Sequence, residues 1–157
     1  MVNKNSAKGF RLRISWLFTL VFFSNMAFAE AINTNSSGVV LNGYDVVAYF
    51  SGEAKPGNRS NVHTTEHGTM WFASNENREK FIANPERYLP AFSGYCAFGV
   101  RMGRKLPIDP ESFVVHNETL YVLLNRATRR MFLDDLDRNL EIAHRLWPQV
   151  QHRPLED

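Results

Sequence analysis

The sequence predicts an α+β fold, in which a small antiparallel sheet from two hairpins packs against short helices and one long C-terminal helix. Two stretches rich in β-branched and aromatic residues, 62–72 and 112–124, each contain a short turn segment, at 67–68 and 116–118. From residue 125 to Pro148, apolar residues recur at helical spacing with charged residues between them. Two hairpins and a long amphipathic helix together indicate this fold class.

A shorter helix is expected between the hairpins. Ser74 is a suitable N-cap residue, and acidic residues follow it in the first turns. Asn84-Pro85 should end this helix, because proline disfavours helical backbone at the residue before it. The core is expected to draw on the following residues: Val47, Tyr49, Phe50, Trp71, Phe72, Phe81, Tyr88, Val114, Tyr121, Leu123, Phe132, Leu136, Leu140 and Trp147.

The first 29 residues have the order of a secretory signal peptide. Basic residues come first, the apolar run 14–23 follows, and Ala27-Phe28-Ala29 supplies a small-x-small cleavage pattern. The apolar run is roughly half the length that a bilayer span requires. We expect residues 1–29 to be removed after Ala29 and the mature protein to be periplasmic or secreted, without membrane attachment; an uncleaved anchor is the alternative.

The rest of the chain is long enough for one domain with a real core. We expect a flexible lead-in over residues 30–40, because most of this segment is polar, then a single domain over 41–148. Residues 149–157 should form a polar tail. The sequence does not indicate an oligomeric state.

The charge of the mature chain gives no reason to expect a nucleic-acid partner. The full sequence has 18 Lys and Arg against 16 Asp and Glu, and four of the bases but none of the acids lie in residues 1–29. Fourteen bases against 16 acids leave a net charge of −2, so the apparent basicity belongs to the export signal.

The single cysteine, Cys96, lies in the glycine-rich segment 92–103 between the two predicted hairpin modules. An exported lone cysteine has no disulfide partner in its own chain. Cys96 is therefore either a small buried hydrophobe or a reactive or metal-binding thiol. Thiolate and thioether groups suit Cu(I), so Cys96 and Met102 are candidate metal ligands, with a histidine brought in by folding. Tyr95 and Cys96 are also candidate ligand-binding residues.

Asp45 is the one acid in a dense apolar stretch, 44–50. An aspartate in this position is more typical of a residue that caps a turn or helix start than of a catalytic group. We also count Asp45 among the candidate ligand-binding residues.

Sequence signatures of common enzymes do not appear. The chain has no Ser/His/Asp signature, no phosphate-binding glycine loop and no zinc-spaced Cys/His pair. Acids at 134, 135 and 137 lack the rest of a calcium-binding loop and fall in a helical pattern, which indicates a solvated face. These observations favour a non-enzymatic protein.

A series of short segments, taken in their order along the sequence, resembles the YHS domain family. The resemblance to the family as a whole lies in Gly43-Tyr44-Asp45-Val46-Val47-Ala48-Tyr49-Phe50, Trp71-Phe72-Ala73-Ser74-x-x-Asn77 and Phe81-x-x-Asn84-Pro85-x-x-Tyr88. Similarity to its exported bacterial branch lies in Gly94-Tyr95-Cys96-Ala97-Phe98, Pro107-Ile108-Asp109-Pro110 and Leu146-Trp147-Pro148. The resemblance covers nearly all of residues 41–148. It implies an exported α+β domain and metal binding, because related domains sit in copper-transporting ATPases.

The chain departs from the metal-associated members at three positions. Where those domains carry cysteines, this sequence has Ala48, Ala73 and Asn77, so a site built on those thiolates is absent. Cys96 lies in the branch-specific stretch, and metal binding does not carry over to it by position.

Three functions remain open at this point. The first is an exported, non-enzymatic binding module for a soft metal ion such as copper, or for a small ligand, near Cys96. The second is a thiol-based redox sensor or enzyme that uses Cys96. The third is a purely structural or interaction domain.

Overall fold

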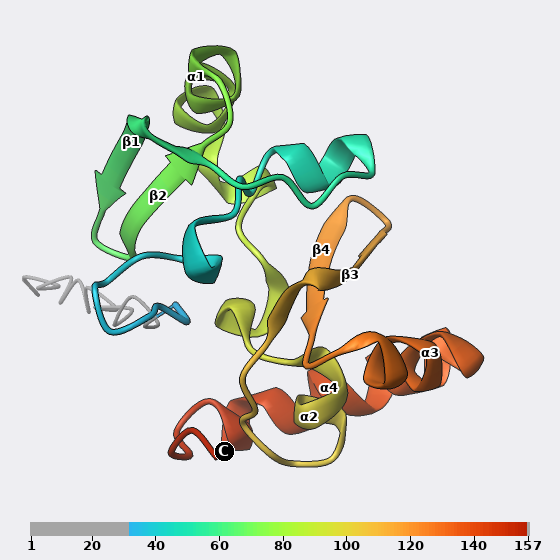
Figure 1. The fold of residues 1–157 in the computed structure, drawn as a ribbon. Helices are drawn as coiled ribbons and strands as arrows, with labels where there is room; N and C mark the ends of the chain where they lie inside the picture. Colours follow the sequence, from blue (N-terminus) through green and yellow to red (C-terminus); the bar gives the residue numbers. More distant parts are fainter. Residues whose placement is uncertain (1–31, 157) are drawn as a thin grey trace, which may run out of the picture.

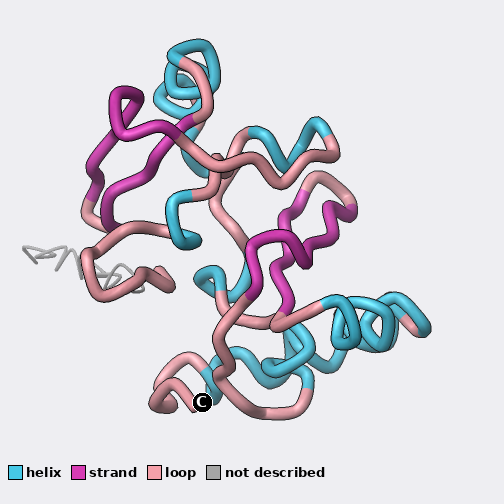
Figure 2. Tube along the Cα trace, viewed as in Figure 1, coloured by secondary structure: helices cyan, strands magenta, loops and turns pink. Residues whose placement is uncertain are grey.

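The computed structural model describes residues 32–156, and the predicted signal peptide lies outside them. Its strands are β1 (Asn58–Thr65), β2 (Gly68–Phe72), β3 (Asp109–His116) and β4 (Thr119–Leu123). Its α-helices are α1 (Asn75–Ala83), α2 (Ala97–Arg101), α3 (Arg126–Asp134) and α4 (Leu136–Val150). Short 3₁₀ turns η1 (Leu41–Gly43), η2 (Ala48–Ser51), η3 (Pro85–Arg87) and η4 (Ala91–Gly94) lie in the connections, which are otherwise loop (Figure 2). The predicted α+β class is confirmed.

The two predicted hairpins are present, and each forms its own two-stranded antiparallel sheet. Hairpin β1–β2 lies with α1 at one end of the molecule, helices α2, α3 and α4 lie at the other, and β3–β4 lies between them (Figure 1). The β3–β4 turn places Asn117 and Glu118 at positive φ, +47° and +57°. Two successive positive φ values are what a tight turn needs if it is to match the twist of its strands.

Strand β4 divides the hydrophobic core into two clusters. Because successive side chains of a strand point to opposite faces, Leu120 and Val122 join a first cluster, and Tyr121 and Leu123 join a second. The first cluster also contains Tyr49, Met70, Phe72 and Phe81, and the second contains Phe92, Cys96, Val100, Phe132 and Ala143. Of the predicted core residues, Phe50, Trp71, Tyr88, Leu136, Leu140 and Trp147 are only partly buried.

The segment 32–40, which we expected to be a flexible lead-in, is packed into the first half of the molecule. Ile32 and Val40 are buried in the first cluster, and the Val40 N–H donates to the Thr69 carbonyl of β2 (3.0 Å). The Asn33 backbone N–H donates to the Ser93 carbonyl (2.7 Å), which ties this segment to η4. The segment is ordered although most of its residues are polar, because its few apolar residues pack against core residues from other parts of the chain.

The C-terminal region, which we expected to be one helix ending at Pro148, is two helices. The break is at Asp135, whose φ of −146° and ψ of 69° are not helical. Asn139 compensates for it, because its buried side-chain amide donates to the Met131 and Phe132 carbonyls at 3.1 and 3.0 Å. Helix α4 then continues through Pro148 to Val150, which is buried in the second cluster.

The polar tail is also part of the domain as far as residue 156. The Glu156 N–H donates to the Lys105 carbonyl (2.8 Å), and its carboxylate pairs with Arg104 (2.7 Å). Arg153 donates to the Gly103 carbonyl (2.9 Å). The tail therefore packs along the connection between α2 and β3.

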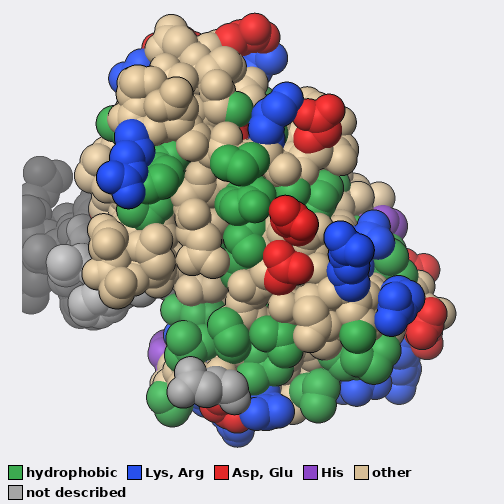
Figure 3. Space-filling model, viewed as in Figure 1, with side chains coloured by type: hydrophobic (Ala, Val, Ile, Leu, Met, Phe, Trp, Pro, Cys, Tyr) green, Lys and Arg blue, Asp and Glu red, His purple; other side chains and the backbone are tan. Residues whose placement is uncertain are grey.

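Basic side chains gather over α3 in the space-filling view (Figure 3). Arg126, Arg129 and Arg130 of this helix are exposed. Their spacing of three and four residues places them on one face of the helix. Within residues 32–156, no helix combines the length and apolarity needed to cross a bilayer.

Candidate functional site

Cys96 is fully buried in the second cluster, where it is the N-cap residue of α2. Its Sγ accepts backbone N–H groups from Gly99 (3.4 Å) and Leu124 (3.2 Å). Burial raises the pKa of the thiol, and these N–H donors offset only part of that effect. A raised pKa keeps the thiol protonated and does not favour a nucleophile or redox centre.

The structure does not bring the predicted metal ligands together. Cys96 and Met102 are the residues at opposite ends of α2, about 9 Å apart at a helical rise of ~1.5 Å per residue. Met102 is 51% exposed, whereas Cys96 is 0% exposed. Among the described residues, no three His, Cys, Asp or Glu side chains are grouped so that they could hold a metal ion.

Tyr95, the other predicted ligand-binding residue beside the cysteine, is partly buried. The Lys105 ammonium lies over its ring, 4.3 Å from the centroid. This contact packs the residue that follows η4 against the connection between α2 and β3.

Asp45 is fully buried, and its carboxylate accepts four hydrogen bonds. Its Oδ1 accepts the N–H groups of Val47 (2.8 Å) and Ala48 (3.3 Å), so it caps the start of η2 as expected. Its Oδ2 accepts the Ala73 N–H (2.8 Å) and the Asn77 side-chain amide (2.7 Å). One carboxylate therefore joins η2, the β2–α1 link and α1, which are up to 32 residues apart.

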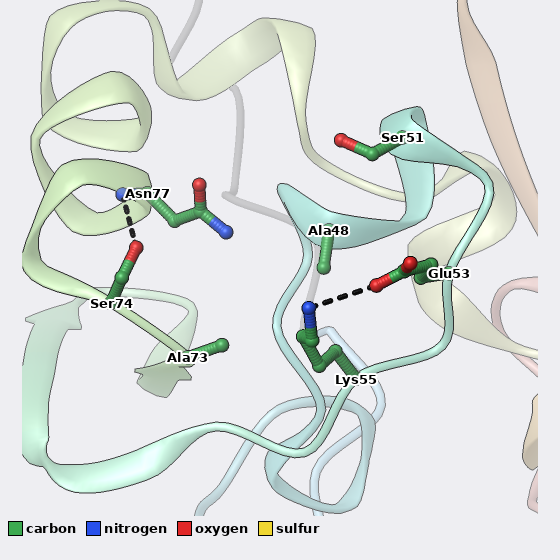
Figure 4. Close-up of a pocket in the computed structure, with 7 residues that line it drawn as sticks. All are labelled: Ala48, Ser51, Glu53, Lys55, Ala73, Ser74 and Asn77. Carbon is green, nitrogen blue, oxygen red and sulfur yellow. Dashed lines mark hydrogen bonds and ion pairs between the residues drawn. The ribbon is translucent and has the colours of Figure 1, made fainter.

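A hollow of about 300 Å³ opens over these joined elements (Figure 4). Its lining consists of Ala48, Ser51, Glu53, Lys55, Ala73, Ser74 and Asn77. Ser51 and Asn77 lie on opposite sides of the hollow, with Ala48 between them (Figure 4). Asp45 does not line the hollow, but its carboxylate hydrogen-bonds the backbone of Ala73 and the side chain of Asn77, which do.

Local sequence explains how the walls form. Ser74 is the N-cap of α1, as predicted, and its Oγ accepts the Asn77 N–H (3.1 Å). This cap fixes the first turn of α1, and the Asp45 contact fixes the Asn77 side chain. Gly52 follows the 3₁₀ turn η2, and its φ of +84° turns the chain so that the 53–55 segment returns along the rim.

An ion pair stands at the rim of the hollow. Lys55 Nζ and Glu53 Oε2 are 2.8 Å apart, and the two side chains are 55% and 62% exposed. The hydrogen bond and charge of Lys55 lower the pKa of Glu53, and those of Glu53 raise the pKa of Lys55. Both groups therefore stay charged across a wide range of pH.

The three positions at which the YHS resemblance places cysteines in metal-associated domains all line this hollow. They are Ala48, Ala73 and Asn77, from η2, the β2–α1 link and α1. In the sequence these positions stand out only as differences from the pattern that the resemblance implies. The other lining residues, Ser51, Glu53, Lys55 and Ser74, were not predicted as site residues, because small polar and charged residues in loops carry no signal of a site by themselves.

Comparison of the chain with protein-family models, curated proteins and solved structures returns no match. The function proposed below is therefore argued from the geometry of this chain and from the resemblance in its sequence.

Proposed function

We propose that this protein is an exported, non-enzymatic binding module of the YHS type, and that it binds a small polar ligand in the hollow at Ala48, Ala73 and Asn77. One observation carries the proposal. Three positions that are separated along the chain, and that the sequence resemblance matches to metal-binding cysteines, line one hollow supported by a buried aspartate.

The side chains at these positions decide the kind of ligand. Two methyl groups and an amide replace the thiolates that a soft metal ion requires. The remaining lining groups offer oxygen and nitrogen atoms, which suit a polar organic molecule. A volume of about 300 Å³ lies at the small end of the range of ligand pockets.

Cys96 is the weaker candidate for the site. Its sulfur is enclosed by apolar side chains and backbone N–H donors, and the hollow lies among residues of the other half of the molecule. We assign Cys96 a packing role.

The proposal predicts that restoring the cysteines creates a soft-metal site. In a Cys96→Ser background, Ala48→Cys, Ala73→Cys and Asn77→Cys together should bind one Cu(I) per chain in competition with a chromophoric Cu(I) chelator. The background protein without these changes should bind none. In the control, Ala83→Cys replaces Asn77→Cys, which places the third thiol at the exposed far end of α1.

The control should bind Cu(I) more weakly than the triple variant, because only two thiols then face the hollow. Equal binding by the two would contradict the convergence of the three positions. Since Asn77→Cys removes a hydrogen bond to Asp45, the pair Ala48→Cys and Ala73→Cys provides a second test. If this folded pair binds no Cu(I), positions 48 and 73 do not converge closely enough to share a ligand, and the observation that carries the proposal fails.

Export is the other part of the proposal and has its own measurement. Cleavage after Ala29 predicts an extracytoplasmic protein that begins Glu30-Ala31. Intact mass spectrometry of protein recovered outside the cytoplasm checks this. A mass that includes residues 1–29 would contradict cleavage.

A further inference from the structure

The geometry points to a small zwitterion, such as a free α-amino acid with a short polar side chain, as the ligand of the hollow. This inference rests on the proposed function and names its ligand class. Three observations carry it: the paired charges at the rim, the uncharged polar groups within the hollow, and the four hydrogen bonds that already occupy the carboxylate of Asp45, which does not line the hollow.

The rim presents one positive and one negative group side by side. Because Lys55 and Glu53 are 2.8 Å apart, a ligand group that approaches one of them also meets the other. A simple anion would be attracted by Lys55 and repelled by Glu53, and a simple cation would meet the reverse. A ligand with adjacent carboxylate and ammonium groups pairs with both, as an α-amino acid does.

The interior of the hollow offers uncharged hydrogen-bonding groups. The Asn77 amide nitrogen is engaged by Asp45, and no protein donor reaches its oxygen within residues 32–156. In the same part of the chain, the Ser51 hydroxyl has no hydrogen-bond partner. The Ser74 oxygen accepts the Asn77 N–H, which leaves its hydroxyl hydrogen to donate. These groups suit a hydroxyl or amide on the ligand.

The same lining is a poor site for a hard metal cation. Glu53 supplies the only carboxylate of the lining, and the Lys55 ammonium is bonded to it. Asp45 lies behind the wall, where both of its oxygens already accept two hydrogen bonds each. Calcium takes about six to eight oxygen ligands, including several carboxylates, and the hollow does not offer them.

Four probes of similar size test the ligand class. L-Serine carries both charges, lactate only the carboxylate, ethanolamine only the ammonium, and glycerol neither. NMR titration should show a saturable shift of the Asn77 side-chain amide with L-serine, with a Kd of about 1 mM or tighter, equivalent to about −4 kcal/mol. The other three probes should bind at least about tenfold more weakly, a loss of about 1.4 kcal/mol.

Removing either charge of the rim pair should lower the affinity for L-serine. Glu53→Gln and Lys55→Met each remove one half of the pair, and each should weaken L-serine binding about tenfold or more, equivalent to about 1.4 kcal/mol. Glu141→Gln is the matched control, because it removes the carboxylate of an exposed ion pair with Arg138 on α4. It should leave binding unchanged.

The outcomes separate the ligand class from the site itself. If the cysteine variants gain Cu(I) binding but L-serine causes no shift, or lactate binds as well as L-serine, the zwitterion inference is overturned and the hollow stands. If Glu53→Gln and Lys55→Met bind L-serine like the parent, the rim pair does not contact the ligand and the inference fails. If the cysteine variants bind no Cu(I) and L-serine causes no shift at Asn77, the hollow is not a binding site and the inference fails with it.

Discussion

Asp45→Ala should lower the free energy of unfolding by about 3–4 kcal/mol. The change removes the carboxylate that accepts four hydrogen bonds. The Ala48 N–H keeps its bond to the Asp45 backbone carbonyl (3.2 Å), and each other buried donor left without a partner costs about 1–3 kcal/mol. Water that enters through the hollow should satisfy part of this loss at Ala73 and Asn77, which line it. Chemical denaturation of the parent and the variant measures the difference.

Asp134→Ala is the control for this measurement. Asp134 is an exposed aspartate at the end of α3, where removal of the carboxylate should change stability by less than about 0.5 kcal/mol. If Asp45→Ala costs no more than this control, the carboxylate does not hold the three elements together. Asp45→Asn should fall between the two, because its amide keeps one accepting oxygen and presents two hydrogens to groups that are themselves donors.

The Cys96 thiol should react with a chromogenic disulfide reagent at least about 1,000-fold more slowly in the native protein than in denaturant. The sulfur is fully buried, so reaction requires an opening whose population follows the stability of the domain. The folded parent should also bind no Cu(I) through this thiol. One equivalent of Cu(I) bound by the folded parent and lost in Cys96→Ser would reinstate copper binding at Cys96 and contradict the packing role.

The raised pKa of Cys96 gives the same prediction a pH signature. Burial disfavours the thiolate in the folded state, so the pKa of Cys96 is higher in the folded than in the unfolded protein. The free energy of unfolding therefore does not depend on this thiol below the unfolded thiol pKa of about 8.5, and it falls as the pH rises above that value. The buried tyrosines, whose pKa burial also raises, add to the loss only from about pH 10. Between these two values the parent should lose stability with pH, and Cys96→Ser should not. Equal slopes would mean that the thiol is not buried.

Local features of the fold were predictable because their causes lie within a few residues of each other. The Ser74 cap and the end of α1 before Asn84-Pro85 follow from side-chain capping and from the backbone of proline. The capping role of Asp45 at η2 follows from the same short-range chemistry. Both hairpins follow from the residue pattern around their turns.

Features set by distant contacts were not predictable from the pattern alone. Nothing around Asp135 indicated a helix break, because the Asn139 amide that bonds the open carbonyls is itself held by Arg101, whose Nε donates to the Asn139 Oδ1 (2.9 Å) across 38 residues of sequence. The burial of residues 32–40 likewise depends on β2 and on η4.

The candidate site shows the same division. The sequence by itself determined that Cys96 is the only cysteine, so positions 48, 73 and 77 carry no thiol. Only the tertiary structure decided that Cys96 is packed in a core, and that Ala48, Ala73 and Asn77 share one hollow with a charged pair at its rim. The physical reason is that a buried carboxylate can bond donors from any part of the chain, and sequence spacing does not record which donors folding brings to it.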